Sequence, residues 1–151
     1  MKTTTLYGLV LAVAAVGVAA LVFGRSTPPA TPDAAPAETA SVLGAALVGV
    51  RLPATLSVKA ASGKSYFEAV CASCHGINAA GQDGAGPPLV HKIYESSHHG
   101  DAAFAVAVRN GARQHHWSFG PMLPVKQKLT DGEIGAIIVY IRELQRENGI
   151  M

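Results

Sequence analysis

Apolar residues run without interruption near the N-terminus and recur periodically farther along the chain. Residues 6–23 contain no charged residue and no proline. As a helix rising about 1.5 Å per residue, this run would reach roughly 27 Å, close to the hydrocarbon thickness of a bilayer. A helix in a soluble core normally keeps a polar face, and this one has none. We therefore predict a signal anchor or transmembrane helix within residues 1–25.

The sequence leaves open whether this helix is retained or removed. Small residues at positions 18–20 would allow cleavage of a signal peptide. The apolar run continues through Phe23, which favours retention as an anchor. Lys2 and Arg25 place one basic residue on each side, so the flanking charges indicate no orientation.

Residues 26–56 are predicted to form a linker. The first part, up to residue 40, is rich in proline and alanine, which is typical of an extended, semi-stiff spacer. Residues 41–56 are apolar again, but this run is too short to cross a bilayer. The sequence does not decide whether this second part packs on the domain that follows.

Residues 57–151 show helical periodicity and no strand-like alternation, which predicts a small all-α domain with long loops. The first helix is expected over residues 62–74 with Ser62 as its N-cap. The second is expected over residues 101–110 with Asp101 as its N-cap. Side chains of these types can accept hydrogen bonds from the free N–H groups of a first helical turn.

The most regular helical pattern lies near the C-terminus, over residues 130–147. Thr130 is followed three residues later by Glu133, which is the spacing of a capping box. Gly149 follows the pattern and predicts the end of the helix. Five apolar residues recur at helical spacing and are predicted to face the core: Ile134, Ile137, Ile138, Ile141 and Leu144.

The composition of residues 57–151 narrows the class of function. Nine Lys and Arg residues stand against eight Asp and Glu residues, and no basic run is present. This balance argues against a nucleic-acid partner and against a strongly basic docking face. Fewer than 100 residues with such long loops would bury little apolar surface by themselves. A large apolar cofactor would supply the missing core.

Residues 71–75 carry the C-x-x-C-H pattern of covalent haem attachment, formed by Cys71, Cys74 and His75. Two cysteines three positions apart at a helix end point the same way, so both thiols can add to the vinyl groups of one haem. The adjacent histidine is then held beneath the iron as an axial ligand. We therefore predict one covalently bound haem c.

Other uses of a C-x-x-C pair fit the chain less well. A zinc site normally needs a second Cys or His pair at regular spacing, and the adjacent His115 and His116 lack that spacing. A thioredoxin-like redox pair belongs at a strand-to-helix turn, whereas these cysteines end a predicted helix. The chain has only these two cysteines, which excludes a disulfide framework.

Further positions carry a family resemblance. Gly63 and Phe67 match the first helix of single-haem class I cytochromes c, and Tyr140 matches the aromatic residue that packs across it. Gly86-Pro87-Pro88-Leu89 match the G-P-x-L turn of that family. Residues 57–151 thus resemble a class I cytochrome c, and the N-terminal helix and linker resemble those of membrane-anchored bacterial members. The resemblance implies an all-α fold wrapped around one haem.

The resemblance also implies a ligand on each face of the iron. The Pro87 carbonyl is expected to accept a hydrogen bond from Nδ1 of His75, which would fix the tautomer of the proximal ligand. Met122 is expected to be the distal ligand, and a thioether raises the potential and closes the iron to small molecules. The family often has proline directly after this methionine, whereas here Leu123 intervenes. The alternative is that Met122 only packs in the core.

Histidines between the proline turn and Met122 keep other arrangements open. One of them could replace Met122 and lower the potential, or two His-His pairs could hold a copper or zinc ion. They could also be polar loop residues or contact the haem propionates, as could Arg109, Arg113 and Trp117. The histidines are His91, His98, His99, His115 and His116.

These predictions together favour a single-electron carrier cycling between Fe(II) and Fe(III), rather than an enzyme. One alternative is a haem-bearing subunit of a larger oxidoreductase, and another is an enzyme or sensor with an open iron. The expected partners are membrane or periplasmic redox proteins acting as electron donor and acceptor. The resemblance implies the periplasmic face of a bacterial inner membrane, or the soluble periplasm if the helix is cleaved.

Overall fold

The computed structural model describes residues 44–151. The anchor expected within residues 1–25 and the linker up to residue 43 lie outside the described residues, so both remain predictions. Within the described range, no helix is both long enough and apolar enough to cross a membrane. The same range contains no strand, only two isolated bridges, so it is helical as predicted.

Helix α2 spans Val58–Val70 and begins one turn before the predicted start. Ser57 is its N-cap, and the Ser57 hydroxyl accepts a hydrogen bond from the Ala60 N–H at 3.2 Å. The prediction of Ser62 as the N-cap is therefore wrong, because Ser57 offers the same chemistry one turn earlier. Ser62 lies inside the helix, where its hydroxyl donates to the Val58 carbonyl.

Helix α4 spans Asp101–Asn110, which are the predicted bounds. Its N-cap is Gly100, so the prediction of Asp101 as the cap is wrong. The Asp101 carboxylate instead accepts a hydrogen bond from Nε of Arg142 at 2.8 Å. An ion pair with a distant residue has replaced the local capping bond.

Helix α5 spans Asp131–Glu147, and its start confirms the predicted capping box. The Thr130 hydroxyl accepts from the Glu133 N–H at 3.3 Å. The Glu133 carboxylate accepts in return from the Thr130 N–H at 2.7 Å. All five apolar residues predicted to face the core are buried. Three short helices complete the described range: α3 (Ala72–His75), η1 (Ile77–Ala79) and η2 (Lys92–Tyr94).

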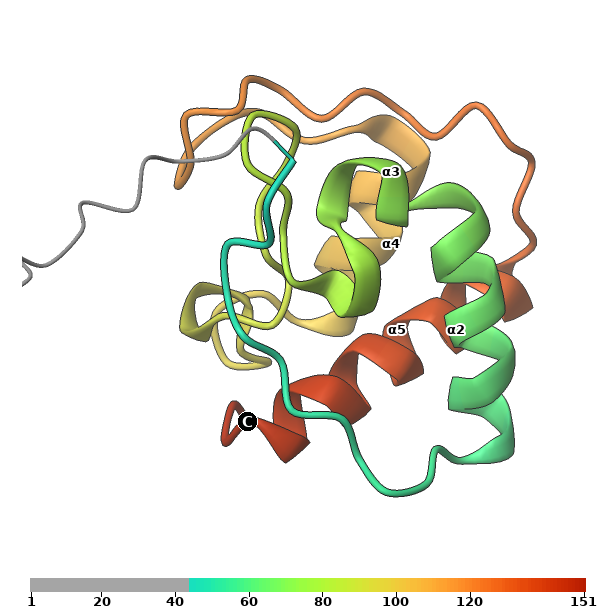
Figure 1. The fold of residues 1–151 in the computed structure, drawn as a ribbon. Helices are drawn as coiled ribbons and strands as arrows, with labels where there is room; N and C mark the ends of the chain where they lie inside the picture. The colour runs from blue at the N-terminus through green and yellow to red at the C-terminus, as the bar shows by residue number, and fades with distance from the viewer. Residues whose placement is uncertain (1–43) are drawn as a thin grey trace, which may run out of the picture. The chain divides into compact units, whose positions relative to one another are not determined.

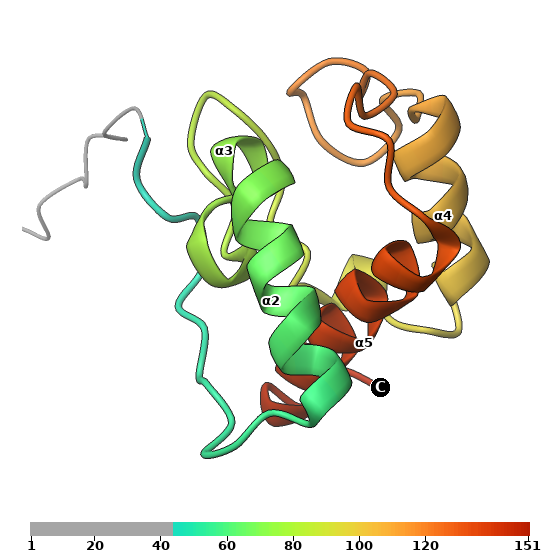
Figure 2. The same ribbon diagram turned by 90° about the vertical axis from the view of Figure 1, so that its right-hand side faces the viewer.

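Helices α2 and α5 cross at the centre of the core (Figure 1; Figure 2). Gly63 permits the close crossing, because a Cβ atom there would lie 1.9 Å from the Ala136 carbonyl oxygen. One turn along α2, Phe67 packs against Tyr140 with the ring centroids 5.7 Å apart. The contact expected between Tyr140 and the first helix is therefore present.

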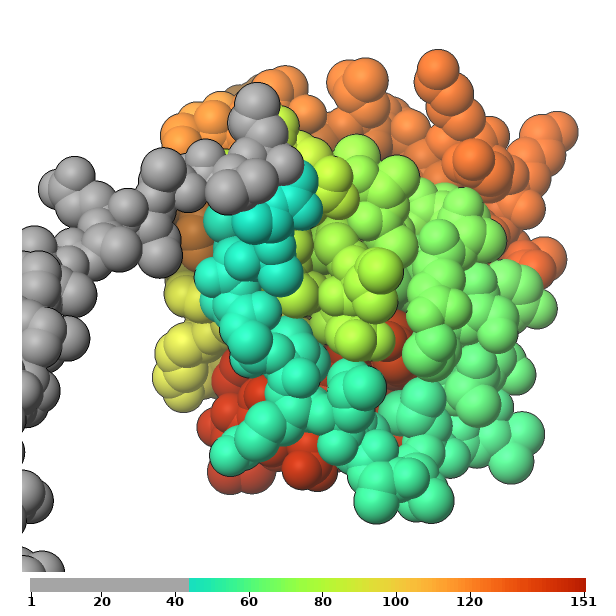
Figure 3. Space-filling view, in the orientation of Figure 1, coloured from blue at the N-terminus to red at the C-terminus, as the bar shows by residue number. Residues whose placement is uncertain are grey.

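Residues 44–56 pack along the domain, which settles a point that the sequence left open. The N–H groups of Leu47 and Val48 both donate to the Ala80 carbonyl, at 3.2 and 3.1 Å. The Arg51 N–H donates to the side chain of Asn148 at 2.9 Å. Figure 3 shows this segment lying across the loop after α3 and the end of α5. The segment thereby joins two distant parts of the domain.

Candidate haem site

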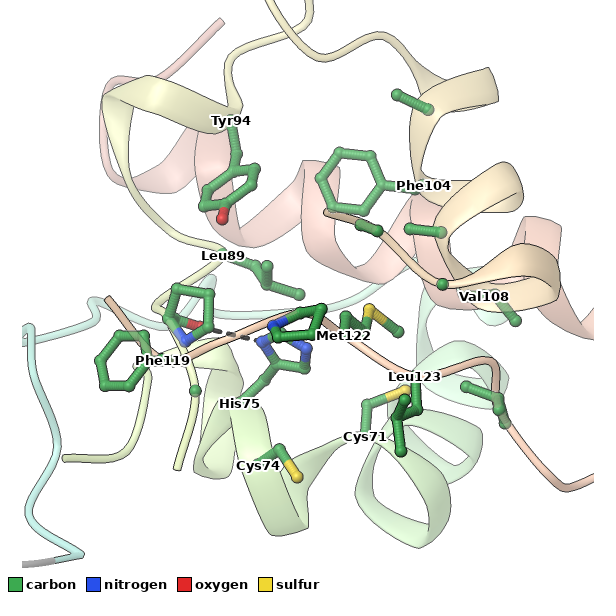
Figure 4. Close-up of a pocket in the computed structure, with 18 of the residues that line it drawn as sticks. Cys71, Cys74, His75, Leu89, Tyr94, Phe104, Val108, Phe119, Met122 and Leu123 are labelled. Atoms are coloured by element: carbon green, nitrogen blue, oxygen red, sulfur yellow. Dashed lines mark hydrogen bonds between the residues drawn. The ribbon is translucent and has the colours of Figure 1, made fainter. Parts of the chain in front are cut away.

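A cavity of about 790 Å³ lies among α2, α3, α4, α5 and the loop that precedes α5 (Figure 4). This volume falls in the range of cofactor pockets in proteins. Most of the wall is apolar, so the cavity favours a large apolar group over water. Apolar residues from two helices and a loop contribute to it: Leu89, Phe104, Val108, Ile137, Ile138 and Ile141.

One wall of the cavity presents the attachment motif. Cys71 follows the last residue of α2, and Cys74 and His75 lie in α3, so a single turn of backbone carries all three. Both cysteines are free thiols, and both line the cavity. Burial, and then the neighbouring Cys74, raise the pKa of the Cys71 thiol to about 11. Cys71 without attached haem is therefore a protonated thiol at neutral pH.

The imidazole of His75 is oriented from behind by the proline turn. Nδ1 of His75 donates to the Pro87 carbonyl at 2.9 Å, which is the hydrogen bond that the resemblance implied. This bond leaves the lone pair of Nε2 available to a metal. Burial lowers the pKa of His75, although the bond to Pro87 opposes that effect. The neutral form that can bind iron is therefore favoured at neutral pH.

Gly86 allows the proline turn to approach α3 closely. A Cβ atom at this position would lie 2.8 Å from the carbonyl oxygen of Cys74. The turn consequently lies directly against the motif, and Pro87 comes within hydrogen-bonding distance of the imidazole of His75. Glycine is required at position 86 because the backbone of the turn touches the backbone of α3, and not because of any contact with haem.

Met122 comes from the loop between α4 and α5, and its side chain points into the same cavity as that of His75 (Figure 4). The backbone is fixed at this point, because Ala112 and Met122 exchange two N–H···O=C hydrogen bonds of 3.0 and 2.9 Å. Gly111 adopts a positive φ of 76°, and a Cβ atom there would lie 2.4 Å from the Met122 carbonyl oxygen. The loop from residue 113 to residue 121 is therefore closed at its base by a paired bridge.

Trp117 offers an independent test of whether the cavity suits haem. Its indole N–H is a buried donor in the cavity wall that makes no hydrogen bond of ordinary geometry within the described residues. The indole lies near the Tyr94 hydroxyl, whose pKa is raised mainly by burial and lowered in part by Trp117. An unpaired buried donor is costly unless a ligand accepts from it. A haem propionate is an acceptor of the required kind.

The other polar residues near Met122 have separate roles. His91 accepts from the Ile93 N–H at 3.2 Å, and its ring packs edge-on against Trp117. Arg109 pairs with Asp131 at 2.5 Å, whereas Arg113 lines the cavity. The remaining four histidines lie together in one cluster. The polar candidates that line the cavity, and so are placed to meet a propionate, are Arg113, Trp117, His99, His115 and His116.

A buried polar network was not foreseen from the sequence. The guanidinium of Arg142 donates to the carbonyls of Tyr94 and His99, at 2.7 and 2.5 Å. It also donates to Gln145, which in turn donates to the Leu89 carbonyl at 2.8 Å. The only sign of this network in the sequence is that Arg142 and Gln145 fall on the apolar side of α5. This network holds the loop over one side of the cavity.

The helical fold and a C-x-x-C-H motif on the wall of a large apolar cavity define a covalent haem protein. The family model for cytochrome c matches residues 60–145, and the chain belongs to the cytochrome c family. No curated protein and no solved structure gives a match. Membership means that the protein carries haem c covalently, and the motif fits one haem. The protein is accordingly an electron carrier that exchanges electrons with other redox proteins.

Proposed function

We propose that the protein is a single-electron carrier anchored to the periplasmic face of a bacterial inner membrane, with His75 and Met122 as the axial iron ligands. Cys71 and Cys74 would carry the two thioether links. The observation that supports this proposal most strongly is the shared cavity. The attachment motif and Met122 both point into one apolar space whose size suits a cofactor.

The residues around the cavity would each contribute to this function. When bound, the haem supplies a one-electron Fe(II)/Fe(III) couple. Pro87 holds the imidazole of His75 in one orientation, which limits the rearrangement that accompanies electron transfer. The bridge between Ala112 and Met122 holds the thioether on a fixed backbone. The apolar wall excludes water, and Trp117 can donate to a propionate.

A redox titration tests the proposed thioether ligand. The full-length protein is expected to follow a one-electron Nernst curve. Met122→His should lower the midpoint potential by a substantial part of the roughly 0.8 V range that axial ligands span, because imidazole stabilises Fe(III) more than a thioether does. Leu123→Ala is the matched control, since Leu123 is 72% exposed and both proposed iron ligands stay in place, and it should shift the potential far less. An equal potential in the wild type and Met122→His would refute ligation by Met122.

Membrane fractionation tests the proposed anchor. Covalent haem can be followed by its peroxidase stain after expression in a bacterium with a cytochrome c maturation system. The full-length protein should sediment with membranes and resist a high-salt wash, because an apolar helix and not surface charge would hold it. A chain in which residues 1–25 are replaced by a cleavable signal peptide should appear in the soluble periplasm. Haem protein that is soluble in both cases would mean that the native helix is removed.

Size-exclusion chromatography of a mild detergent extract distinguishes the free carrier from a subunit of a larger oxidoreductase. A tethered carrier visits its partners only transiently, and the tether raises its concentration near membrane partners. The haem should therefore elute at the size of the single chain with its micelle. Stable co-elution of haem with other chains at a fixed ratio would favour the subunit alternative.

A further inference from the structure

Four histidines form a cluster on two loops at the edge of the cavity, and three of them, His99, His115 and His116, also line it. His98 and His99 precede α4, whereas His115 and His116 lie in the loop that leads to Met122. Nε2 of His98 lies 3.2 Å from Nε2 of His116. Nε2 of His99 lies 3.3 Å from Nε2 of His115. The imidazole nitrogens of residues far apart in sequence are thus brought face to face in two pairs.

Hydrogen bonds on the far side of two rings fix where their protons lie. Nδ1 of His99 donates to the Ile93 carbonyl at 2.8 Å. Nδ1 of His115 donates to the Arg113 carbonyl, also at 2.8 Å. In the neutral rings both Nε2 atoms therefore carry lone pairs and no hydrogen. Two lone pairs facing each other at 3.3 Å do not form a hydrogen bond. A proton or a metal ion between the two nitrogens would turn this repulsion into attraction.

The spacing of these nitrogens suits a metal ion. Zinc binds histidine nitrogen at about 2.0–2.1 Å, so two nitrogens on the same tetrahedral ion lie about 3.3 Å apart. The two Nε2 pairs have separations of 3.2 and 3.3 Å. Ligand nitrogens of His98, His99 and His116 also lie within 4.8 Å of one another. Metal-binding histidines commonly donate their second ring N–H to a backbone carbonyl, which orients the ring. Nδ1 of His99 and Nδ1 of His115 make such bonds.

The backbone beneath the cluster is fixed by other parts of the fold. The guanidinium of Arg142 donates to the His99 carbonyl at 2.5 Å, and the side chain of Arg142 is only 11% exposed. On the second loop, the paired bridge between Ala112 and Met122 closes the base. The ligands are therefore held in place before any ion arrives.

We propose that His98, His99 and His116 bind one divalent late transition-metal ion such as Zn(II) or Cu(II), with His115 placed beside the site at 3.3 Å from Nε2 of His99. Neutral imidazole nitrogen is a preferred donor for these ions. The site uses neither His75 nor Met122, and it links the loop before α4 to the loop that bears Met122. A bound ion would therefore restrain the loop from which the proposed distal ligand comes.

Isothermal titration of the purified, haem-loaded, full-length protein without a polyhistidine tag tests this site. Zn(II) and Cu(II) are titrated separately, and the bound metal is counted per haem after gel filtration. Each ion should saturate at one per chain. The single variants His98→Ala and His116→Ala should each weaken binding by about tenfold or more, because each removes a ligand. His98 is exposed and does not line the cavity, so His98→Ala should leave the haem spectrum unchanged.

His91→Ala is the matched control, because His91 lies outside the cluster and packs edge-on against Trp117. It should bind Zn(II) and Cu(II) like the wild type. Amide hydrogen exchange gives a second readout: Zn(II) should slow exchange in residues 113–121 in the wild type but not in His116→Ala. The proposal is overturned if no saturable binding occurs, if binding survives His98→Ala and His116→Ala, or if His91→Ala abolishes it. None of these readouts depends on whether Met122 binds iron.

Discussion

Gly63 sets the closest approach between the two central helices. A Cβ atom there would lie 1.9 Å from the Ala136 carbonyl oxygen, and backbone atoms cannot move aside as a flexible side chain can. Gly63→Ala should therefore destabilise the haem-loaded protein by about 1–3 kcal/mol through overpacking. Denaturant unfolding followed by the haem absorbance measures this loss.

Gly49→Ala is the control for that change. A Cβ atom at Gly49 would meet nothing within 4 Å, so stability should stay within about 0.5 kcal/mol of the wild type. If Gly63→Ala were as stable as Gly49→Ala, the helix crossing would have to be looser than the structure shows.

Residues that act through a local pattern could be predicted, and residues that act through distant partners could not. Cys71, Cys74 and His75 are adjacent in sequence, so their spacing alone indicated covalent haem. Arg142 gave no such signal, because its partners come from loops some forty residues earlier in the chain. The sequence offered two His-His pairs as a copper or zinc site, but it did not show that His98 would face His116 and His99 would face His115.

At the scale of an element, the capping box of α5 makes stability depend on pH. Hydrogen bonds from the N–H and hydroxyl of Thr130 lower the pKa of Glu133 below its ordinary value of 4.5. The folded state therefore binds this proton more weakly than the unfolded chain does. The stabilising contribution is present in full above pH 4.5 and is lost as the pH falls through the folded pKa.

Glu133→Gln isolates this contribution, because glutamine keeps the shape of the side chain and removes its charge. The variant should be less stable than the wild type at pH 7, and the difference should shrink once the pH falls below 4.5. Parallel denaturant titrations from pH 3 to pH 7 provide the measurement. A difference that stayed constant across this range would show that the charge of Glu133 contributes nothing to the cap.

Helix starts illustrate what a single sequence can and cannot predict about elements. The start of α5 was predicted correctly because Thr130 and Glu133 form two reciprocal hydrogen bonds within four residues. The start of α2 was predicted wrongly because Ser57 and Ser62 offer the same side chain, and tertiary packing selects between them. Asp101 was misassigned because its carboxylate is drawn to Arg142 on another helix.

At the scale of the whole molecule, Arg142 connects α5 to α4 and to the loop over the cavity. Its side chain donates to Asp101 and to the carbonyls of Tyr94 and His99. Arg142→Met should destabilise the protein by on the order of 3 kcal/mol, because buried carbonyls would lose their donors. Thermal or denaturant unfolding of the haem-loaded protein checks this value.

Arg146 provides the matched control on the next turn of the same helix. It is 58% exposed and approaches Glu143 only to 3.9 Å. Arg146→Met should therefore change stability by no more than about 0.5 kcal/mol. Equal losses in the two variants would mean that the buried network around Arg142 is not specifically stabilising.

The need for a cofactor could be inferred from the sequence, but the enclosure of the cavity could not. A short chain with long loops lacks apolar core, and the cavity of about 790 Å³ lies where that core is missing. The packing of residues 44–56 was undecided because an apolar, loop-like segment has no period that reveals a partner. Its contacts with Ala80 and Asn148 depend on a fold that is already formed.

The optical spectrum of ferric Met122→Ala tests the central claim most directly, because that claim is a haem held between His75 and Met122. The wild type should show the Met–Fe charge-transfer band, and its ferrous form should not bind carbon monoxide without denaturant. Met122→Ala should lose the band and bind carbon monoxide, whereas Leu123→Ala should keep the wild-type spectrum. A band that persists in Met122→Ala, or a wild type that lacks the band and binds carbon monoxide, would contradict the account.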